Sequence, residues 1–353
     1  MHYPENRELQ EVFERIESCL ENGLPFAIYR KPDHKELLAV FQSDQELVVS
    51  TDFTERGFVF APFDKENEAV LIQPDEIWKG EFILDKPPIN SKISLDETGK
   101  EDHLNLIKSG IQEIEKGRLQ KVVLSRRIEV PITKNPAQIF KTLLHHYPNA
   151  FGYLFHHPKV GTWCGATPET LVKVKDRKLQ TMSLAATLTF VENEDPKWGS
   201  KEIEEQQMVS EYIGDKLAHT MERLEIDEAE SVRAGNLWHL RSEVRGTMLA
   251  DLKVKKVINA LHPTPAVCGI PTGEAQQFIQ ANENYQRTFY TGFLGELNLS
   301  SQGELSLFVN LRCMQLEDDK ASIFVGGGIT GASDPESEWI ETQNKSKTML
   351  GIL

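Results

Sequence analysis

The sequence of 353 residues is poor in cysteine and has no long apolar run. Its four cysteines are scattered, with no C-x-x-C pair and no histidines at zinc-ligand spacing, so we expect reduced thiols rather than disulfides or structural zinc. No run of about eighteen apolar residues occurs, and the polar, acidic start MHYPENRELQEVFERIE lacks the features of an export signal. We therefore expect a cytoplasmic protein that does not enter a membrane.

Positive charge is also in short supply. The chain has 54 Asp and Glu residues against 39 Lys and Arg, a net charge of −15, which repels phosphate backbones and argues against a nucleic-acid partner. An anionic ligand would need local positive charge from a metal ion, an arginine or both. With 39% hydrophobic residues, the chain can bury a large core and is the size of an enzyme.

The hydrophobic pattern predicts an α+β fold with mostly antiparallel sheets, because helices interrupt strands that are joined by hairpin-length turns. Residues 1–95 begin with an amphipathic helix that ends near Asn22 and Gly23, followed by short strands that predict an antiparallel half-sheet. A polar, proline-containing connection follows, so we divide the chain into residues 1–95 and 96–353.

Two long elements are predicted in the second part. The apolar pattern of residues 200–225 predicts one helix, and that of residues 304–317 predicts one strand.

The glycine run near the end, GGGITG, matches the dinucleotide fingerprint G-x-G-x-x-G. Only 22 residues follow Gly331, too few to complete a βαβ unit, and no G-x-x-x-x-G-K-[ST] motif occurs, so we exclude a nucleotide loop. The glycines could still let backbone N–H groups approach an anion. A glycine turn that closes a strand explains the run equally well.

Two pairs of glutamates stand three residues apart on predicted helices, Glu202 with Glu205 and Glu338 with Glu341. Each pair projects to one side of its helix, and hard oxygen donors without His or Cys nearby suit Mg²⁺. A solvated helix surface is the commoner meaning of either pair alone.

Four polar residues stand within apolar segments. Lys121 opens a strand, where burial could make it a general base or where it could protect a sheet edge. Glu169, after a proline, could be kept protonated as an acid or be exposed. His239 fits a core histidine, whereas Arg312 among apolar residues favours an anion.

Nine segments occur in the order found in the chorismate-utilising enzymes, and the resemblance covers about residues 100–353. These enzymes include isochorismate synthase, salicylate synthase, the large subunit of anthranilate synthase and aminodeoxychorismate synthase. The segments are KVVLSRRIEV, GATPETLVKV, SLAATL, SKEIEEQQMVSEYIGD, LWHLRSEVRG, LHPTPAVCGIP, YTGFLGEL, NLRCMQL and GGGITGASDPESEWIETQNK.

The resemblance implies two mostly antiparallel sheet-containing halves with outer helices, the active site in the cleft between them, chorismate as substrate and Mg²⁺ as cofactor. It implies Glu205 and Glu341 as metal ligands, with Glu202 and Glu338 behind them through water. The residues that it implies for substrate binding are Thr187, His239, Arg312, Gly326, Gly328 and Lys345.

Lys121 resembles the residue of those members that add water to the ring, which implies an isomerase of the isochorismate synthase type. Lys121 would deprotonate water for attack at carbon 2, and Glu169 would protonate the hydroxyl leaving carbon 4. We expect a monomer without a glutamine amidotransferase subunit, serving menaquinone or siderophore synthesis. Salicylate synthase is the alternative, and Ala186, where the family usually has glycine, leaves open an inactive chorismate-binding relative.

Overall fold

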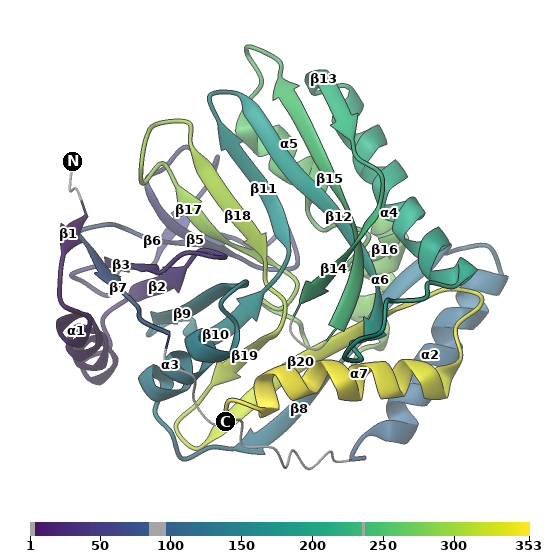
Figure 1. Ribbon diagram of the computed structural model, residues 1–353, viewed down its shortest axis with the longest axis horizontal. Helices are drawn as coiled ribbons and strands as arrows, with labels where there is room; N and C mark the ends of the chain where they lie inside the picture. The colour runs from purple at the N-terminus through teal and green to yellow at the C-terminus, as the bar shows by residue number, and fades with distance from the viewer. Residues whose placement is uncertain (1–3, 85–96, 235–236) are drawn as a thin grey trace.

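The computed structural model describes residues 4–84, 97–234 and 237–353 as two large sheets, with helices outside them (Figure 1). The first sheet has the order β1 (Glu5–Asn6), β7 (Glu76–Glu81), β3 (Glu36–Phe41), β2 (Phe26–Arg30), β9 (Phe151–His157), β10 (Gly161–Thr167), β19 (Cys313–Leu316), β20 (Lys320–Ile329), β8 (Lys121–Pro131) and β16 (Gly269–Ile270). Among its described strand pairs only β1 with β7 is parallel.

The second sheet has the order β13 (Met221–Ile226), β15 (Leu237–Met248), β12 (Lys178–Thr189), β11 (Thr170–Lys175), β18 (Leu305–Val309), β17 (Phe293–Leu297), β5 (Gly57–Ala61), β6 (Ala69–Ile72) and β4 (Val48–Ser50), with β14 (Glu230–Ala234) beside β15. The helices are α1 (Leu9–Asn22), α2 (Lys100–Glu115), α3 (Pro136–His146), α4 (Ser200–Ala218), α5 (Val254–Leu261), α6 (Thr272–Asn282) and α7 (Pro335–Leu350). The predicted α+β class with mostly antiparallel sheets is confirmed.

Alternation along the strands explains the layers. In β2, Phe26 and Ile28 join the apolar cluster that includes α1 and α3, whereas Ala27 and Tyr29 join an aromatic cluster shared with strands of the second sheet. Successive side chains of a strand point to opposite faces, so this continuous apolar run serves two cores. The aromatic cluster between the sheets holds the two halves of the molecule together.

The N-terminal strands are divided between the two sheets, so the predicted single half-sheet is wrong. β2, β3 and β7 extend the first sheet beside β9, whereas β4, β5 and β6 extend the second beside β17. Short strands of similar pattern do not reveal their partners, because pairing depends on long-range contacts. The proposed boundary between residues 95 and 96 lies outside the described residues.

Two long predicted elements also divide. The helix expected over 200–225 ends at Ala218, and β13 follows because it pairs with β15, a tertiary contact that overrides helix propensity. The strand expected over 304–317 splits into β18 and β19, which belong to different sheets. Arg312 lies at this break with a left-handed φ of 47°, so it is not inside a strand as predicted.

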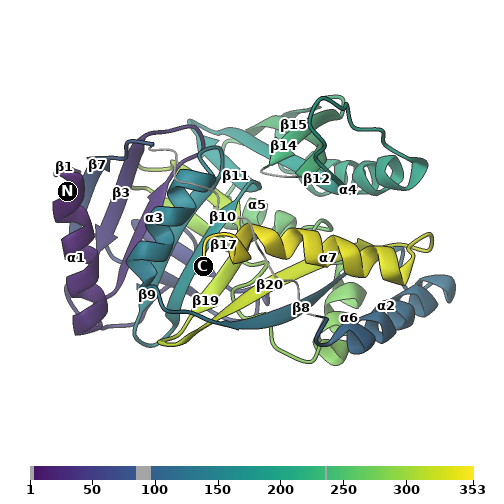
Figure 2. The same cartoon turned by 60° about the horizontal axis from the view of Figure 1, so that its bottom comes forward.

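Helices α4 and α7 carry the paired glutamates. Asp334 caps α7 by accepting a hydrogen bond from Ser337 N at 2.8 Å, and Pro335 opens the helix. Figure 2 shows α7 running along β20 with α2 beside it, while α4 runs along the second sheet. The two helices therefore pack on different sheets.

All four cysteines lie in the described part of the chain and are buried free thiols, as the sequence predicts. Among the described residues, no helix is long and apolar enough to cross a membrane.

Candidate active site

Two crossings of the chain between the sheets lie side by side. The chain passes from β10 into β11 through Glu169, and from β18 into β19 through Arg312. Val309 N donates to Glu169 O, and Ala166 N donates to Arg312 O, each at 3.0 Å. These bonds fasten the crossings to each other, so the side chains of Glu169 and Arg312 can enter one cavity.

This cavity lies between the two sheets and spans about 730 Å³, including its open mouth. It brings together most of the residues named from the sequence. Those that line it are Glu169, Thr187, Glu205, His239, Arg312, Gly326, Gly328, Glu341 and Lys345. Lys121, Glu338 and Glu202 do not line it.

Glu169 is an acid that burial keeps protonated. Only 3% of the residue is exposed, and desolvation raises the pKa of its carboxyl group to about 8, although Lys121, Arg312 and Lys345 oppose this shift through their charges. Near neutral pH this carboxyl group therefore carries a proton that it can give to a bound molecule.

Lys121 lies directly behind the cavity wall. It is the first residue of β8 and pairs with Ile270 in β16, and its side chain is completely buried. Its Nζ lies 2.9 Å from Glu205 Oε1 in an ion pair, and Glu205 faces the cavity. Glu205 therefore connects the buried amino group to the cavity.

Three carboxylates converge on this side of the cavity, and each is paired with a lysine. Besides Lys121 with Glu205, Lys201 Nζ lies 2.6 Å from Glu338 Oε1 and Lys345 Nζ lies 2.6 Å from Glu341 Oε1. Lys201 comes from α4 and Glu338 from α7, so this ion pair joins the two helices. Each glutamate balances the charge of its lysine, and Glu169 is protonated and neutral. The charge of Arg312 therefore makes the cavity positive, although the protein as a whole is acidic.

The glycine run is the end of β20 and pairs in register with β8, so it is not a turn. A Cβ atom on Gly328 would come within 2.5 Å of Glu205 Oε1, and one on Gly327 within 3.2 Å of Glu338 Oε2. The glycines are therefore needed for space. Strand β19 pairs with β20 only as far as Ile323. Beyond that residue the edge of β20 has no pairing with β19 and lines the cavity.

The donor set around these glycines fits a hard divalent cation. Glu338 Oε2 is buried without a hydrogen-bond partner, and desolvation and the nearby Glu341 raise the pKa of its carboxyl group. Among the described residues, no three His, Cys, Asp or Glu side chains are grouped to hold a metal by themselves. In many enzymes Mg²⁺ binds one or two carboxylates and completes its coordination shell with oxygens of water and of the bound ligand. Glu205 and Glu341 could provide the two carboxylates.

Glu202 is not brought together with the other three glutamates. Its Oε2 accepts a hydrogen bond at 2.9 Å from Gly199 N and so caps the start of α4. The first turn of a helix has free N–H groups that attract a carboxylate, which explains this orientation. Its implied role near a metal stays a prediction.

On the opposite side of the cavity, His239 of β15 contacts three other groups. Its Nδ1 lies 2.8 Å from Ala186 O and 3.4 Å from Thr187 Oγ1, and its Nε2 lies 3.2 Å from an amino group of Arg312. Arg312 also donates to Thr348 Oγ1 at 3.4 Å. Ala186 lies in a bulge of β12 with φ 61°, a conformation that favours glycine.

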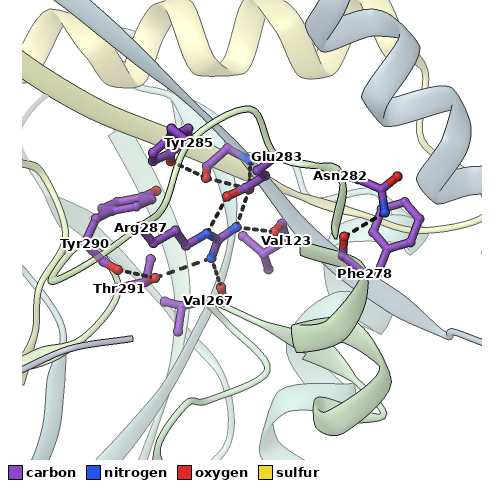
Figure 3. Close-up of polar contacts among 10 residues, drawn as sticks. Val123, Val267, Phe278, Asn282, Glu283, Tyr285, Arg287, Tyr290 and Thr291 are labelled. Carbon is purple, nitrogen blue, oxygen red and sulfur yellow. Dashed lines mark hydrogen bonds and ion pairs between the residues drawn. The ribbon is translucent and has the colours of Figure 1, made fainter. Parts of the chain in front are cut away.

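A buried ion pair, Arg287 with Glu283, lies next to the cavity, and Figure 3 draws its contacts. Arg287 binds both carboxylate oxygens of Glu283, at 2.6 and 2.8 Å, and donates to Val123 O at 2.7 Å and Val267 O at 2.9 Å. Glu283 also accepts from the amide and hydroxyl groups of Ser125. Val123 and Val267 line the cavity, so this pair fixes the backbone of two of its walls.

Three residues near the cavity were missed in the sequence, namely Lys201, Tyr290 and Thr291. Tyr290 and Thr291 line it and open the segment YTGFLGEL, whose pattern by itself does not single out either residue. Lys201 precedes Glu202 and resembled ordinary helix surface. Four positions separate it from Glu205, which places the two on one helical face.

The fold and the cavity are those of an enzyme, with a protonated carboxyl group, a guanidinium group and lysine-paired carboxylates around one cavity between two sheets. The comparisons give the family. The chain belongs to the family described as chorismate binding enzyme, whose model matches residues 73–353.

Relatives of known name agree with this family. The chain is 30% identical over 315 residues to isochorismate synthase DhbC of Bacillus subtilis, which covers 82% of this chain and 78% of that protein. It is 29% identical over 302 residues to isochorismate synthase MenF of Escherichia coli, which covers 80% of this chain and 69% of the relative.

Solved structures share the fold. The crystal structure of the putative 2,3-dihydroxybenzoate-specific isochorismate synthase DhbC from Bacillus anthracis superposes with a TM-score of 0.82 at 24% identity, covering 96% of this chain and 99% of that one. Anthranilate synthase component I from Streptococcus pneumoniae has a TM-score of 0.69 at 19% identity, covering 92% of this chain and 90% of that one. The resemblance inferred from nine short segments is confirmed.

Proposed function

We propose that this protein is an isochorismate synthase, an isomerase that converts chorismate to isochorismate. The observation that carries the proposal is the placement of a protonated acid and a buried amine about one cavity. The pKa of Glu169 is about 8, and the charge of Lys121 acts on it, so the two groups are close enough to interact. Family membership and relatives that bear this name support the same choice.

The reaction adds a hydroxyl at ring carbon 2 and removes the one at carbon 4. Lys121 acts as the base in its neutral amine form, after it has passed its own proton to Glu205, its partner at 2.9 Å, and it then takes a proton from the attacking water. Glu169 gives a proton to the departing hydroxyl, which leaves as water. One water enters and one leaves, so substrate and product have the same mass. Arg312 and Lys345 bind the carboxylates of the substrate.

Glu205 and Glu341 would hold Mg²⁺, with Glu338 behind them. The ion would supply positive charge to the ring carboxylate and draw electron density toward it. The support is the convergence of three carboxylates on the glycine strand, one of them with a buried oxygen that has no partner. Binding of Mg²⁺ to the protein alone, measured by calorimetry, tests this assignment without turnover.

Incubation of the purified protein with chorismate and Mg²⁺, followed by mass analysis of the products, tests the activity. We expect a product of unchanged mass, and no product after EDTA treatment. Salicylate and pyruvate as main products would replace the proposal by a salicylate synthase. Chorismate binding without any turnover, in protein and in Lys121→Ala alike, would make the chain an inactive relative.

Finer expectations belong to this proposal. We expect a monomer in the cytoplasm that works without a glutamine amidotransferase subunit and supplies menaquinone or siderophore synthesis. Light scattering of the purified protein with chorismate tests the monomer, and turnover without ammonia or glutamine tests the independence from an amidotransferase.

A further inference from the structure

His239 stands between two groups whose hydrogen-bonding roles cannot change. The backbone carbonyl of Ala186, 2.8 Å from Nδ1, can only accept a hydrogen bond. The guanidinium of Arg312, 3.2 Å from Nε2, can only donate one. Nδ1 must therefore carry the proton and Nε2 must be the acceptor, which fixes a single neutral tautomer.

The two neighbours of His239 both have unusual backbones. Ala186 has φ 61° and Arg312 has φ 47°, left-handed values that are strained for an L-residue. Ala186 lies on a bulge of the second sheet, and Arg312 lies where the chain crosses to the first sheet. His239 bonds to the backbone carbonyl of one of these segments and to the side chain of the other, so it links the bulge to the guanidinium group of Arg312.

The surroundings of His239 disfavour the charged form of its ring. The residue is 5% exposed, and desolvation first, then the charges of Arg312 and Lys345, lower its pKa to about 3, although the bond to the carbonyl of Ala186 acts in the other direction. Both ring nitrogens are occupied by protein groups, so neither is free to exchange a proton with a ligand.

We propose that His239 is a positioning residue, which holds the guanidinium of Arg312 toward the cavity through Nε2 and is itself fixed by the carbonyl of Ala186. This inference rests on the proposed function for its effect on catalysis, because Arg312 is there the group that binds a substrate carboxylate. Its structural part, the tautomer and the two bonds, does not depend on any activity.

The first test is nitrogen-15 NMR of the histidines of the full-length protein without substrate, with His239 assigned by its absence in His239→Asn. We expect a neutral ring at pH 7 that carries its proton on Nδ1. A proton on Nε2, or a charged imidazolium at pH 7, would overturn the proposal. This result stands whatever the enzyme does with chorismate, so it separates failure of this inference from failure of the proposed function.

The second test compares two variants of similar polarity. His239→Gln places an amide oxygen near the former Nε2 and can still accept from Arg312, whereas His239→Asn reaches only the level of Nδ1 and loses that bond. Loss of a hydrogen bond to a charged group corresponds to a rise in KM of between about ten- and a hundredfold for the Asn variant. We expect a clearly smaller rise for the Gln variant, and kcat changed less than KM in both.

A role of His239 in proton transfer would give a different pattern. Both variants would then lose kcat by a similar large factor, and a limb of the pH profile of kcat would disappear. Equal KM for the Gln and Asn variants, with thermal midpoints like that of the parent protein, would also contradict the positioning role.

Discussion

The two sides of the cavity are built on different physical principles. On the side of the crossings, Glu169 and His239 are buried, and desolvation moves their pKa values to about 8 and about 3, so both are neutral near pH 7. On the side of the helices, Glu205, Glu338 and Glu341 are each paired with a lysine across 2.6 to 2.9 Å. On the first side burial decides the protonation state. On the second side lysine charges oppose burial, and they lower the pKa of Glu205 but leave that of Glu338 raised.

This difference separates two tasks that would interfere if they were mixed. A proton donor needs a raised pKa, and a cation bound beside it would lower that pKa. Carboxylates that hold a cation must instead stay ionised, which a nearby lysine favours. Glu169 and His239 come from a chain crossing and from β15, whereas the glutamates come from α4 and α7, so each set keeps its own electrostatic environment around one ligand.

Loss of the proton donor should have the largest effect. Glu169→Gln keeps the shape of the side chain but has no acidic proton, so we expect kcat to fall by about 10³-fold, within the range for a general acid. Glu317→Gln, an exposed carboxylate outside the cavity, is the matched control and should leave kcat unchanged. Steady-state kinetics with chorismate checks this, and a Glu169→Gln enzyme with more than a tenth of the parent kcat would refute the assignment.

Substitutions of the glutamates that are paired with lysines should weaken Mg²⁺ binding, whereas substitution of Glu169 at the chain crossing should not. Glu341→Gln removes one of the two proposed ligands, so we expect the Kd for Mg²⁺ in the absence of chorismate to rise by about tenfold or more. Glu169→Gln should leave that Kd within about twofold. Titration calorimetry of both variants decides the matter, and equal loss of Mg²⁺ binding in the two would mean that the sides do not act separately.

The raised pKa of Glu169 also makes stability depend on pH. The folded protein holds this proton up to a pKa of about 8, whereas the unfolded chain releases it near 4.5, so the contribution is complete below pH 4.5 and is lost as pH rises to 8. Between these values the free energy of unfolding should fall by about 1.4 kcal/mol per pH unit for this group. The free energy of unfolding of Glu169→Gln, measured by urea titration at several pH values, should lack that part of the pH dependence. The same pH dependence in the variant and the parent protein would show that Glu169 is not protonated in the folded protein.

The smallest effect is expected at Ala186. Glycine at this left-handed position relieves strain of about 1 kcal/mol but costs about as much in unfolded-chain entropy, so Ala186→Gly should change stability by less than about 1 kcal/mol. Ala185 is the preceding residue of the same strand and has no positive φ. Ala185→Gly therefore relieves no strain and should destabilise the protein by about 1 kcal/mol. Thermal unfolding of both compares them directly, and a lower stability for Ala186→Gly than for Ala185→Gly would contradict the strain.

Much of the local structure could be predicted from the sequence. The helix that ends at Asn22, the terminal helix with Glu338 and Glu341, and the strand that begins at Lys121 all appear where the apolar pattern places them. Periodicity reports which face of an element is buried, and this information is local. The segments that resembled the chorismate-utilising enzymes carried the residues that now line the cavity.

The failures lie where the chain changes partner. Residues 304–317 have the apolar pattern of one strand, yet they divide at Arg312 between two sheets. The residues after Ala218 leave their helix to pair with β15. In each case a contact with a distant or backbone group outweighs a local preference.

The sequence by itself determined which side chains are available, an acid after a proline, a lysine at a strand end and glutamates three apart, because residue type and spacing are written in it. Only the tertiary structure decided which of them became neutral and which stayed charged. The reason is physical, since a pKa depends on the exclusion of water and on charges brought near by folding, and both are set by segments far apart in the chain.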